Sequence, residues 1–165
     1  MARGKMATRH GGRELAFQVL YGLSFASVHT LDELQDIFYS SPGNQAKESI
    51  STTPSGFAWE LVEGVWKSAT LLDDVIDRHS HNWRVNRMGR VELTLLRLAV
   101  FEMLCRDDIP SKVAINEALD LSRQFGDDGA GSFINGILDA VAKAQENGTL
   151  KSPLIHNSSP SKQAG

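Results

Sequence analysis

A stripe of polar side chains runs along one predicted helix, between residues 110 and 126. Lys112, Asn116 and Asp120 follow one another at spacings of four, and Arg123 comes three residues later. Residues three and four positions apart share one face of a helix. Cations and amides on a rigid, half-buried helix suit the binding of a polar ligand, and no nucleophile or set of metal ligands accompanies them. The stripe therefore indicates a binding protein and not an enzyme.

Two other patterns resemble metal sites but are incomplete. The acidic segment 73–77 (DDVID) has the spacing with which prenyl and terpene synthases bind magnesium and a diphosphate. Those enzymes need a second metal site and a much larger cavity, so we expect a solvated acidic face here. His79 and His81 lack further ligands of suitable spacing, because the single cysteine, Cys105, stands alone. With no glycine-rich phosphate loop either, we expect no metal, no cofactor and no catalysis.

The charge of the chain is unevenly distributed. Residues 1–13 contain four bases and no acid, whereas the rest of the chain contains 13 bases and 20 acids. A basic arm on an acidic body suits contact with nucleic-acid phosphates. The alternative is a disordered start that only aids solubility. We expect residues 1–8 to form a disordered basic arm, residues 9–146 a helical domain, and residues 147–165 a disordered tail.

Length and composition are those of one globular domain. A chain of 165 residues with 41% hydrophobic and 22% charged residues can bury one sizeable core. The longest apolar stretch is interrupted by Glu92, Arg97 and Glu102, so no segment should span a membrane. No apolar signal segment follows the basic N-terminus. These features predict a cytoplasmic protein without disulfide bonds.

Apolar periodicity predicts helices along most of the chain. The helix over residues 89–104 is apolar on nearly all sides and should lie at the centre of the domain. No window alternates as a strand would, so the predicted class is all-α with about seven helices. Residues 39–53 are rich in Ser, Thr, Pro and Gly and should form a loop. The other helices should begin near residues 8–12, 31, 54, 69, 110 and 128.

Capping residues predict where several of these helices begin and end. Thr30 can cap the second helix, and the Thr-Pro pair at residues 53–54 marks the start of the third. A break at Ser68 should separate the third helix from the fourth. The remaining boundaries are Pro110 and Gly126 around the polar stripe, Asp127 or Asp128 as the cap of the last helix, and Asn147-Gly148 at its end.

Two phenylalanines flank a glycine-rich turn before the last helix. Phe125 and Phe133 enclose residues 126–131, where backbone amides could accept an anion and an exposed ring could stack on a base. The alternative is that both rings are core residues and the glycines form a tight corner. Asn116 and Asn135 offer amide edges for unpaired bases, but they could equally be buried amides that tie helices together. The sequence leaves both questions open.

Four groups of residues follow one another along the predicted helices. They are Arg13-Glu14 with Ala16, Gln18, Leu20 and Tyr21; Gly89, Val91 and Glu92 with Leu96 to Ala99 and Phe101-Glu102; Ile109-Pro110 with Lys112 to Ala118 and Phe125-Gly126; and Phe133 to Asp139. In these motifs the chain resembles the NusB family of bacterial transcription antitermination factors. The resemblance covers about residues 9–144.

The resemblance implies an all-helical domain of two packed helical bundles. It also implies a non-enzymatic factor that binds boxA, a single-stranded RNA element of ribosomal RNA transcripts, together with NusE, a small-subunit ribosomal protein. The complex would act on RNA polymerase in antitermination and so promote processive transcription. The partner-binding residues that it implies are Tyr21 and Glu92. The candidate RNA-binding residues, from the resemblance and the residue types together, are Arg9, His10, Arg13, Lys112, Asn116, Phe125, Phe133 and Asn135.

A second hypothesis assigns most of the RNA contact to the partner. An acidic body lowers the affinity for RNA, so the chain would then be a protein-interaction adaptor for NusE with little RNA binding of its own. The sequence also leaves open whether the chain forms a homodimer. Apolar residues such as Phe25, Trp66 and Trp83 could be exposed and favour one.

Overall fold

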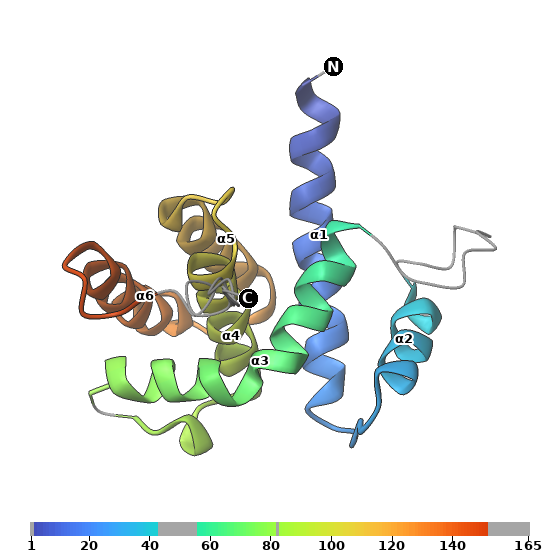
Figure 1. The fold of residues 1–165 in the computed structure, drawn as a ribbon, viewed down its shortest axis with the longest axis horizontal. Coiled ribbons are helices and arrows are strands. Elements are labelled where there is room, and N and C mark those ends of the chain that lie inside the picture. Colours follow the sequence, from blue (N-terminus) through green and yellow to red (C-terminus); the bar gives the residue numbers. More distant parts are fainter. Residues whose placement is uncertain (1, 43–55, 82, 152–165) are drawn as a thin grey trace, which may run out of the picture.

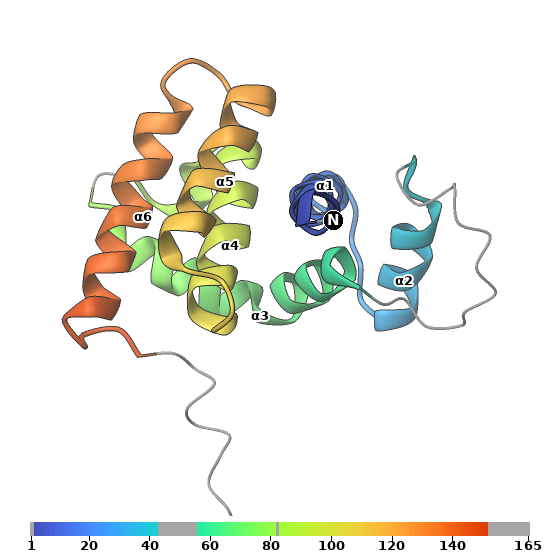
Figure 2. The same cartoon turned by 90° about the horizontal axis from the view of Figure 1, so that it is seen from above.

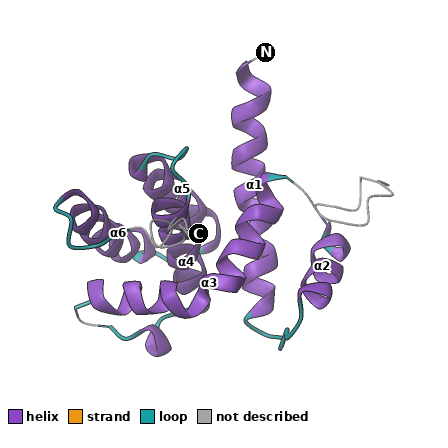
Figure 3. Ribbon diagram, in the orientation of Figure 1, coloured by secondary structure: helices purple, strands orange, loops and turns teal. Residues whose placement is uncertain are grey.

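The computed structural model describes residues 2–42, 56–81 and 83–151, and for residues 2–8 it describes only the backbone. These parts contain six α-helices, one short 3-10 turn and no strand, which confirms the all-α class; Figure 3 shows the helices in purple. None of the described helices is long and apolar enough to cross a membrane. The elements are α1 (Ala2–Leu23), α2 (Leu31–Ser40), α3 (Phe57–His79), η2 (Val85–Arg87), α4 (Arg90–Cys105), α5 (Ser111–Phe125) and α6 (Ala130–Glu146).

Helix α3 joins two groups of helices, as Figures 1 and 2 show. Its first half lies beside α1, with α2 at the outer edge, and its second half runs along α4 and α6. Helix α5 packs on α4 and α6, and α1 also contacts α4 and α5. The molecule therefore has the two packed helical bundles that the resemblance implied.

Helix α4 lies at the centre of the molecule, as predicted. Ten of its 16 residues are buried, including one charged residue, Glu102. Removing so many apolar side chains from water stabilises the helix where it packs against its neighbours. Because α4 contacts α1, α3, α5 and α6, it fixes the relative positions of the surfaces that those helices carry.

Residues 57–79 form one helix and not the two that we predicted. Helix α3 continues through Ser68 and changes direction near its middle, as Figure 1 shows. Gly64 lies against the ring of Phe101, and a side chain at residue 64 would overlap that ring. The absence of a side chain lets α3 approach α4 closely, and glycine and serine allow a helix to bend without breaking. The Thr-Pro pair at residues 53–54 lies outside the described residues.

Several predicted helix boundaries are confirmed. Thr30 caps α2, because its Oγ1 accepts a hydrogen bond from the backbone N–H of Glu33 at 3.2 Å. Helix α5 lies between Pro110 and Gly126, and α6 ends before the pair at residues 147–148. These boundaries depend on the capping chemistry of neighbouring residues, which the sequence displays directly.

The predicted capping of α6 by Asp127 or Asp128 is wrong. Gly129 is the N-cap residue, with a φ of 91°, and no side chain caps the helix. The backbone N–H of Ala130 donates to the backbone carbonyl of Asp127 at 3.1 Å. Glycine adopts a positive φ without strain, so the turn is built around Gly129 and both aspartates remain exposed.

Helix α1 begins at Ala2, earlier than the predicted start near residues 8–12. The helix runs through Gly11 and Gly12 without a break. A Cβ at Gly12 would lie 3.0 Å from Cδ1 of Phe57, so the missing side chain lets α1 approach the start of α3. The division of the chain into a basic arm, a domain and a tail stays a prediction.

Candidate nucleic-acid interface

Two adjacent residues of α1 contact different neighbours. Nη2 of Arg9 donates a hydrogen bond to Oδ2 of Asp108, in the α4–α5 loop, at 2.8 Å. Nδ1 of His10 lies 2.7 Å from Oε2 of Glu117, on α5. The side chains are 38% exposed for Arg9 and 45% exposed for His10. Both residues therefore help to fix α1 against α5 and its preceding loop, and both stay accessible to solvent.

Glu117 increases the positive charge at His10. Its hydrogen bond and its negative charge raise the pKa of His10 above the ordinary value of 6.5. Burial opposes this rise, while the negative charges of Asp120 and Glu14 add to it. More of His10 is therefore protonated near neutral pH than of an isolated histidine. In that state the ring is a cation that can bind phosphate.

Arg13 lies inside the molecule and not on an exposed surface. The residue is 3% exposed, and its Nε donates to Oε1 of Glu102 at 2.7 Å. A second carboxylate, that of Glu117, lies 3.9 Å from its Nη1. Burial raises the pKa of Glu102 to about 6, against the lowering influence of Arg13. A phosphate could reach Arg13 only if this ion pair opened, so the geometry favours a role in holding α1 against α4.

The polar stripe of α5 divides into two halves. Lys112 and Asn116 are exposed, and neither has a hydrogen bond or an ion pair within the described part of the chain. Asp120 and Arg123 instead pair with each other. The first half of α5 thus presents a free ammonium and a free amide one turn apart. Because the side chain of Asn116 is exposed, the alternative that it is a buried amide is excluded.

The turn between α5 and α6 forms an open cleft of about 480 Å³, lined in part by Arg123 and Asn135. Asn135 is exposed, which excludes the buried-amide alternative for this residue too. Phe125 packs on Phe17 with ring centroids 4.8 Å apart, and Phe133 also packs against the core. Both Phe125 and Phe133 are only half-buried, so each combines core packing with a surface that a ligand can reach.

The candidate RNA-binding residues fall into two groups along α5. Arg9, His10, Lys112 and Asn116 lie along its first part and the adjoining stretch of α1, and we name this surface the α1–α5 face. The cleft follows the last turn of α5, about 20 Å from Lys112 at the rise of an α-helix. A ligand that contacts both groups must therefore be extended.

Arg106 and Asp108 adjoin the α1–α5 face, and the sequence analysis did not identify them. Nε and Nη2 of Arg106 donate to the carboxylate of Asp108 at 3.0 and 3.1 Å. Hydrogen bonds from Arg106 and then from Arg9 lower the pKa of Asp108 to about 2. The only signal in the sequence is a short run of charges at residues 106–108, which by itself is typical of a solvated loop.

One of the two candidate partner-binding residues, Tyr21, contacts an exposed aromatic side chain, and the other, Glu92, lies on the first turn of α4. Tyr21 stacks on Phe17 with ring centroids 5.9 Å apart and meets the edge of Phe25 at 5.3 Å. Phe25 is 60% exposed, and the guanidinium of Arg90 lies 4.2 Å from its ring centroid. Arg90 and Glu92 belong to the first turn of α4. We name Tyr21, Phe25, Arg90 and Glu92 the aromatic patch; the sequence analysis did not identify Arg90.

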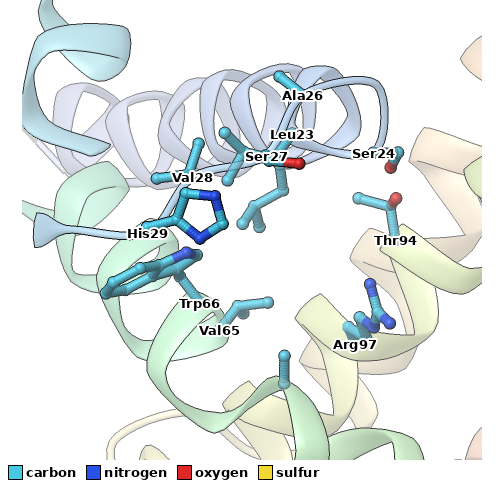
Figure 4. A pocket seen from close by; sticks show the side chains of 12 residues that line it. Leu23, Ser24, Ala26, Ser27, Val28, His29, Val65, Trp66, Thr94 and Arg97 are labelled. Atoms are coloured by element: carbon cyan, nitrogen blue, oxygen red, sulfur yellow. The ribbon is translucent and has the colours of Figure 1, made fainter. Parts of the chain in front are cut away.

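A second cleft, of about 370 Å³, opens between the end of α1, the α1–α2 linker, α3 and α4. Figure 4 shows His29 and Trp66 on one side of this cleft and Thr94 and Arg97 on the other. Arg97 donates two hydrogen bonds to the carboxylate of Asp73, at 2.6 and 2.7 Å, so its charge is paired. Apolar walls with a few polar groups are typical of a site that accepts an apolar ligand group.

The acidic segment 73–77 has structural partners. Asp73 and Asp74 each pair with an arginine, and Asp77 accepts a hydrogen bond from the backbone N–H of Val85 at 2.8 Å. Among the described residues, no group of three His, Cys, Asp or Glu side chains could hold a metal ion. Contacts within the chain therefore account for this segment.

The sequence matches a family model and named relatives. The model described as the NusB family matches residues 10–143. A transcription antitermination protein NusB from Desulfovibrio desulfuricans is 64% identical over 154 residues, covering 92% of this chain and 94% of that protein. A protein of the same name from Myxococcus xanthus is 45% identical over 141 residues, covering 84% of this chain and 97% of that protein.

Solved structures share the fold. NusB of T. maritima superposes with a TM-score of 0.66 at 30% identity, covering 86% of this chain and 97% of that one. A crystal structure of the antitermination factors NusB and NusE in complex with dsRNA gives a TM-score of 0.65 at 25% identity, with 84% and 98% covered. The similarity thus extends over most of the chain.

Proposed function

The chain belongs to the NusB family, and we propose that it binds boxA single-stranded RNA of ribosomal RNA transcripts together with NusE, a small-subunit ribosomal protein. In this role it promotes processive transcription by RNA polymerase through binding alone, without catalysis. The observation that carries the proposal is the free pair of Lys112 and Asn116 on the α1–α5 face. A solved structure of similar fold, which contains NusB, NusE and RNA, supports it.

The α1–α5 face binds the phosphates of the RNA backbone. Lys112 supplies an unpaired positive charge, and His10 adds charge when it is protonated. Each phosphate that a cation neutralises releases counterions, so the affinity should fall as the salt concentration rises. Arg13 supports this face from inside the molecule and does not touch the RNA.

The region around the turn after α5 binds unpaired bases. Asn135 lines the cleft and can hydrogen-bond with a base edge, whereas Phe125 and Phe133 flank the turn outside the cleft and can stack on bases with their accessible surfaces. Asn116 provides a second amide between this cleft and Lys112. Because the solved complex of NusB and NusE contains dsRNA, the preference of this chain for a single strand is part of the test.

The aromatic patch and the neighbouring cleft bind NusE. Phe25 and Arg90 provide an exposed ring and a guanidinium, which are side-chain types enriched where protein interfaces contribute most affinity. Tyr21 packs against Phe25 in an edge-to-face contact. Glu92 adds a carboxylate on the same turn of α4 as Arg90. The acidic charge of the chain outside residues 1–13 favours a basic partner such as a ribosomal protein.

The proposal is tested by replacing Lys112 with alanine and titrating a fluorescent boxA strand over a range of salt concentrations. Loss of one phosphate contact should reduce the slope of log affinity against log salt by about one. Lys151→Ala removes an exposed charge beyond α6 and should leave the slope unchanged. A slope that Lys112→Ala leaves unchanged would contradict the proposed face, and equal affinity for the duplex would contradict the preference for a single strand.

A second candidate function is that of an adaptor for NusE with little RNA binding of its own. It is favoured by the pairing of Arg9, His10 and Arg13 with carboxylates, which leaves Lys112 as the unpaired cation among the four cationic residues predicted to bind RNA. Under this alternative the isolated chain binds boxA RNA weakly even at low salt, and addition of NusE creates most of the affinity. The same titration, without and with NusE, distinguishes the two functions.

A further inference from the structure

Three arginine side chains surround one aromatic ring where α1 meets the start of α3. The guanidinium carbons of Arg9, Arg13 and Arg106 lie 5.1, 5.1 and 5.4 Å from the ring centroid of Phe57. Contact between guanidinium groups and an aromatic face restrains their positions. Phe57 thus brings two cations of α1 together with a third, Arg106, that follows α4.

The three arginines differ in how their charges are balanced. Arg13 is buried against Glu102, so its charge is not available at the surface. Arg9 and Arg106 share one carboxylate, that of Asp108, through hydrogen bonds of 2.8, 3.0 and 3.1 Å. The side chain of Asp108 is 47% exposed, so solvent reaches the shared carboxylate. Arg106 also donates to Glu60, whose side chain is 54% exposed.

Asp108 occupies a position that suits a phosphate. Nε and Nη2 of Arg106 form the planar fork with which arginine binds either a carboxylate or a phosphate through two parallel hydrogen bonds. Arg9 approaches the same carboxylate from α1. We propose that Arg9 and Arg106 form a binding site for a phosphate of the RNA backbone, and that Asp108 fills this site in the free protein. This inference rests on the proposed binding of RNA.

The exchange of Asp108 for a phosphate needs little rearrangement. Asp108 lies in the short α4–α5 loop and is exposed, so its side chain can turn into solvent while Phe57 and Glu60 keep Arg106 in place. With Asp108 bound, the charges of Asp108 and Glu60 balance those of Arg9 and Arg106, so these four residues have no net charge. Once Asp108 leaves, the cluster has a net positive charge that a phosphodiester can neutralise.

The position of the cluster agrees with this role. His10 follows Arg9 on α1, and Lys112 follows Asp108 by four residues, on the first turn of α5. The proposed phosphate site therefore continues the α1–α5 face beyond Lys112. If the ion pairs served only to attach α1 to the α4–α5 loop, removing the carboxylate would loosen that contact without strengthening the binding of RNA.

Two variants of adjacent residues distinguish these roles. Asp108→Asn keeps the size of the side chain and removes the charge that competes with phosphate. Asp107→Asn makes the same change of net charge at a neighbouring exposed residue that has no hydrogen bond or ion pair in the described chain. Both are titrated with a fluorescent boxA strand over a range of salt concentrations, without and with NusE.

We expect Asp108→Asn to bind the RNA about fivefold more tightly than the unmodified protein, with a salt slope steeper by up to about one. Asp107→Asn should change the affinity by less than about twofold, because the charge it removes is exposed, screened by salt and paired with neither arginine. Arg106→Gln should weaken binding, and it should cancel the gain when it is combined with Asp108→Asn. Thermal unfolding of each variant checks that the fold is kept.

An Asp108→Asn variant that gains no more affinity than Asp107→Asn would overturn the inference, as would a gain that persists with Arg106→Gln. A folded Asp108→Asn variant that binds RNA more weakly would show that the cluster is structural. These results leave the proposed function intact as long as Lys112→Ala still lowers the salt slope. If the unmodified protein binds no RNA at low salt, with or without NusE, the proposed function fails and the inference fails with it.

Discussion

The α1–α5 face and the aromatic patch both include residues of α1, but their chemistry differs. On the α1–α5 face, Arg9 and His10 are paired with carboxylates from the α4–α5 loop and from α5. At the aromatic patch, Phe25 is 60% exposed, and a cleft of about 370 Å³ lies close by. The first surface should bind through charge and respond to salt, whereas the second should bind through burial of apolar area.

The two surfaces are also separated along α1. Arg9 and Tyr21 are 12 residues apart, which corresponds to about 18 Å along a helix. One molecule can therefore bind an RNA strand near one end of α1 and a protein near the other. The comparison predicts that substitutions at one surface affect one ligand, and that the supporting ion pair of Arg13 affects the fold.

The largest effect should come from Arg13→Ala. It leaves Glu102 buried without a partner, a change that typically costs about 3–5 kcal/mol of stability. Arg9→Ala removes an exposed ion pair with Asp108, which typically contributes about 0–1 kcal/mol. Urea unfolding followed by circular dichroism measures both free energies. Equal losses in the two variants would contradict the assignment of Arg13 to the interior.

The next largest effect should be that of Glu92→Lys on the binding of NusE. Glu92→Lys puts a positive charge in the aromatic patch, where a basic partner repels it. We expect a loss of about 2 kcal/mol or more of binding free energy, roughly thirtyfold in affinity. Glu146→Lys, at the exposed end of α6, is the matched control. Co-elution and calorimetry with NusE provide the measurement. Retained binding by Glu92→Lys, with the fold intact, would remove Glu92 from the interface.

Filling the cleft beside the patch should have a smaller effect. Ala69 lines this cleft, whereas Thr70 is exposed and does not line it. Ala69→Trp should weaken NusE binding about tenfold, or about 1.4 kcal/mol, while Thr70→Trp should leave it unchanged. The affinity for RNA should stay the same in both variants. If both tryptophans have the same effect on NusE binding, the cleft is not part of that interface.

The smallest effect should be the pH dependence at His10. The pKa of His10 lies above 6.5 in the folded chain. At a pH below this raised pKa, His10 is protonated, pairs with Glu117 and presents a positive charge to the RNA. Both contributions are lost as the pH rises through the raised pKa. We expect the affinity for RNA to fall about twofold as the pH rises through the raised pKa of His10. Glu117→Gln should return the pKa of His10, measured by NMR, toward 6.5; a pKa unaffected by this change would contradict the assigned cause.

Local patterns were sufficient to predict much of the fold. The all-α class, the central position of α4, the start of α2 and both ends of α5 depend on apolar periodicity and on capping residues such as Thr30 and Pro110. The errors arose where distant residues decide the structure. Helix α3 continues through Ser68, and its Gly64 packs against Phe101 of α4, a contact that no local signal in the sequence could reveal.

The candidate site was predictable by residue type but not by environment. The sequence placed Lys112 and Asn116 one turn apart on a polar stripe, but it left open whether Asn116 is buried, and the structure shows that both are exposed. The sequence did not show that Arg13 is buried, because the partner carboxylate of Glu102 lies 89 residues away. It missed Arg106 for the same reason, since the arginine that shares Asp108 with it lies on a different helix.

The separation of the two surfaces is tested most directly by NMR titration of the isotopically labelled protein, first with boxA RNA and then with NusE. The account predicts that RNA shifts the signals of His10, Lys112 and Asn116, and that NusE shifts those of Phe25 and Glu92. Neither ligand should alter the set that the other affects. If RNA shifted the signals of Phe25 and Glu92 while those of Lys112 and Asn116 stayed in place, the account would be contradicted.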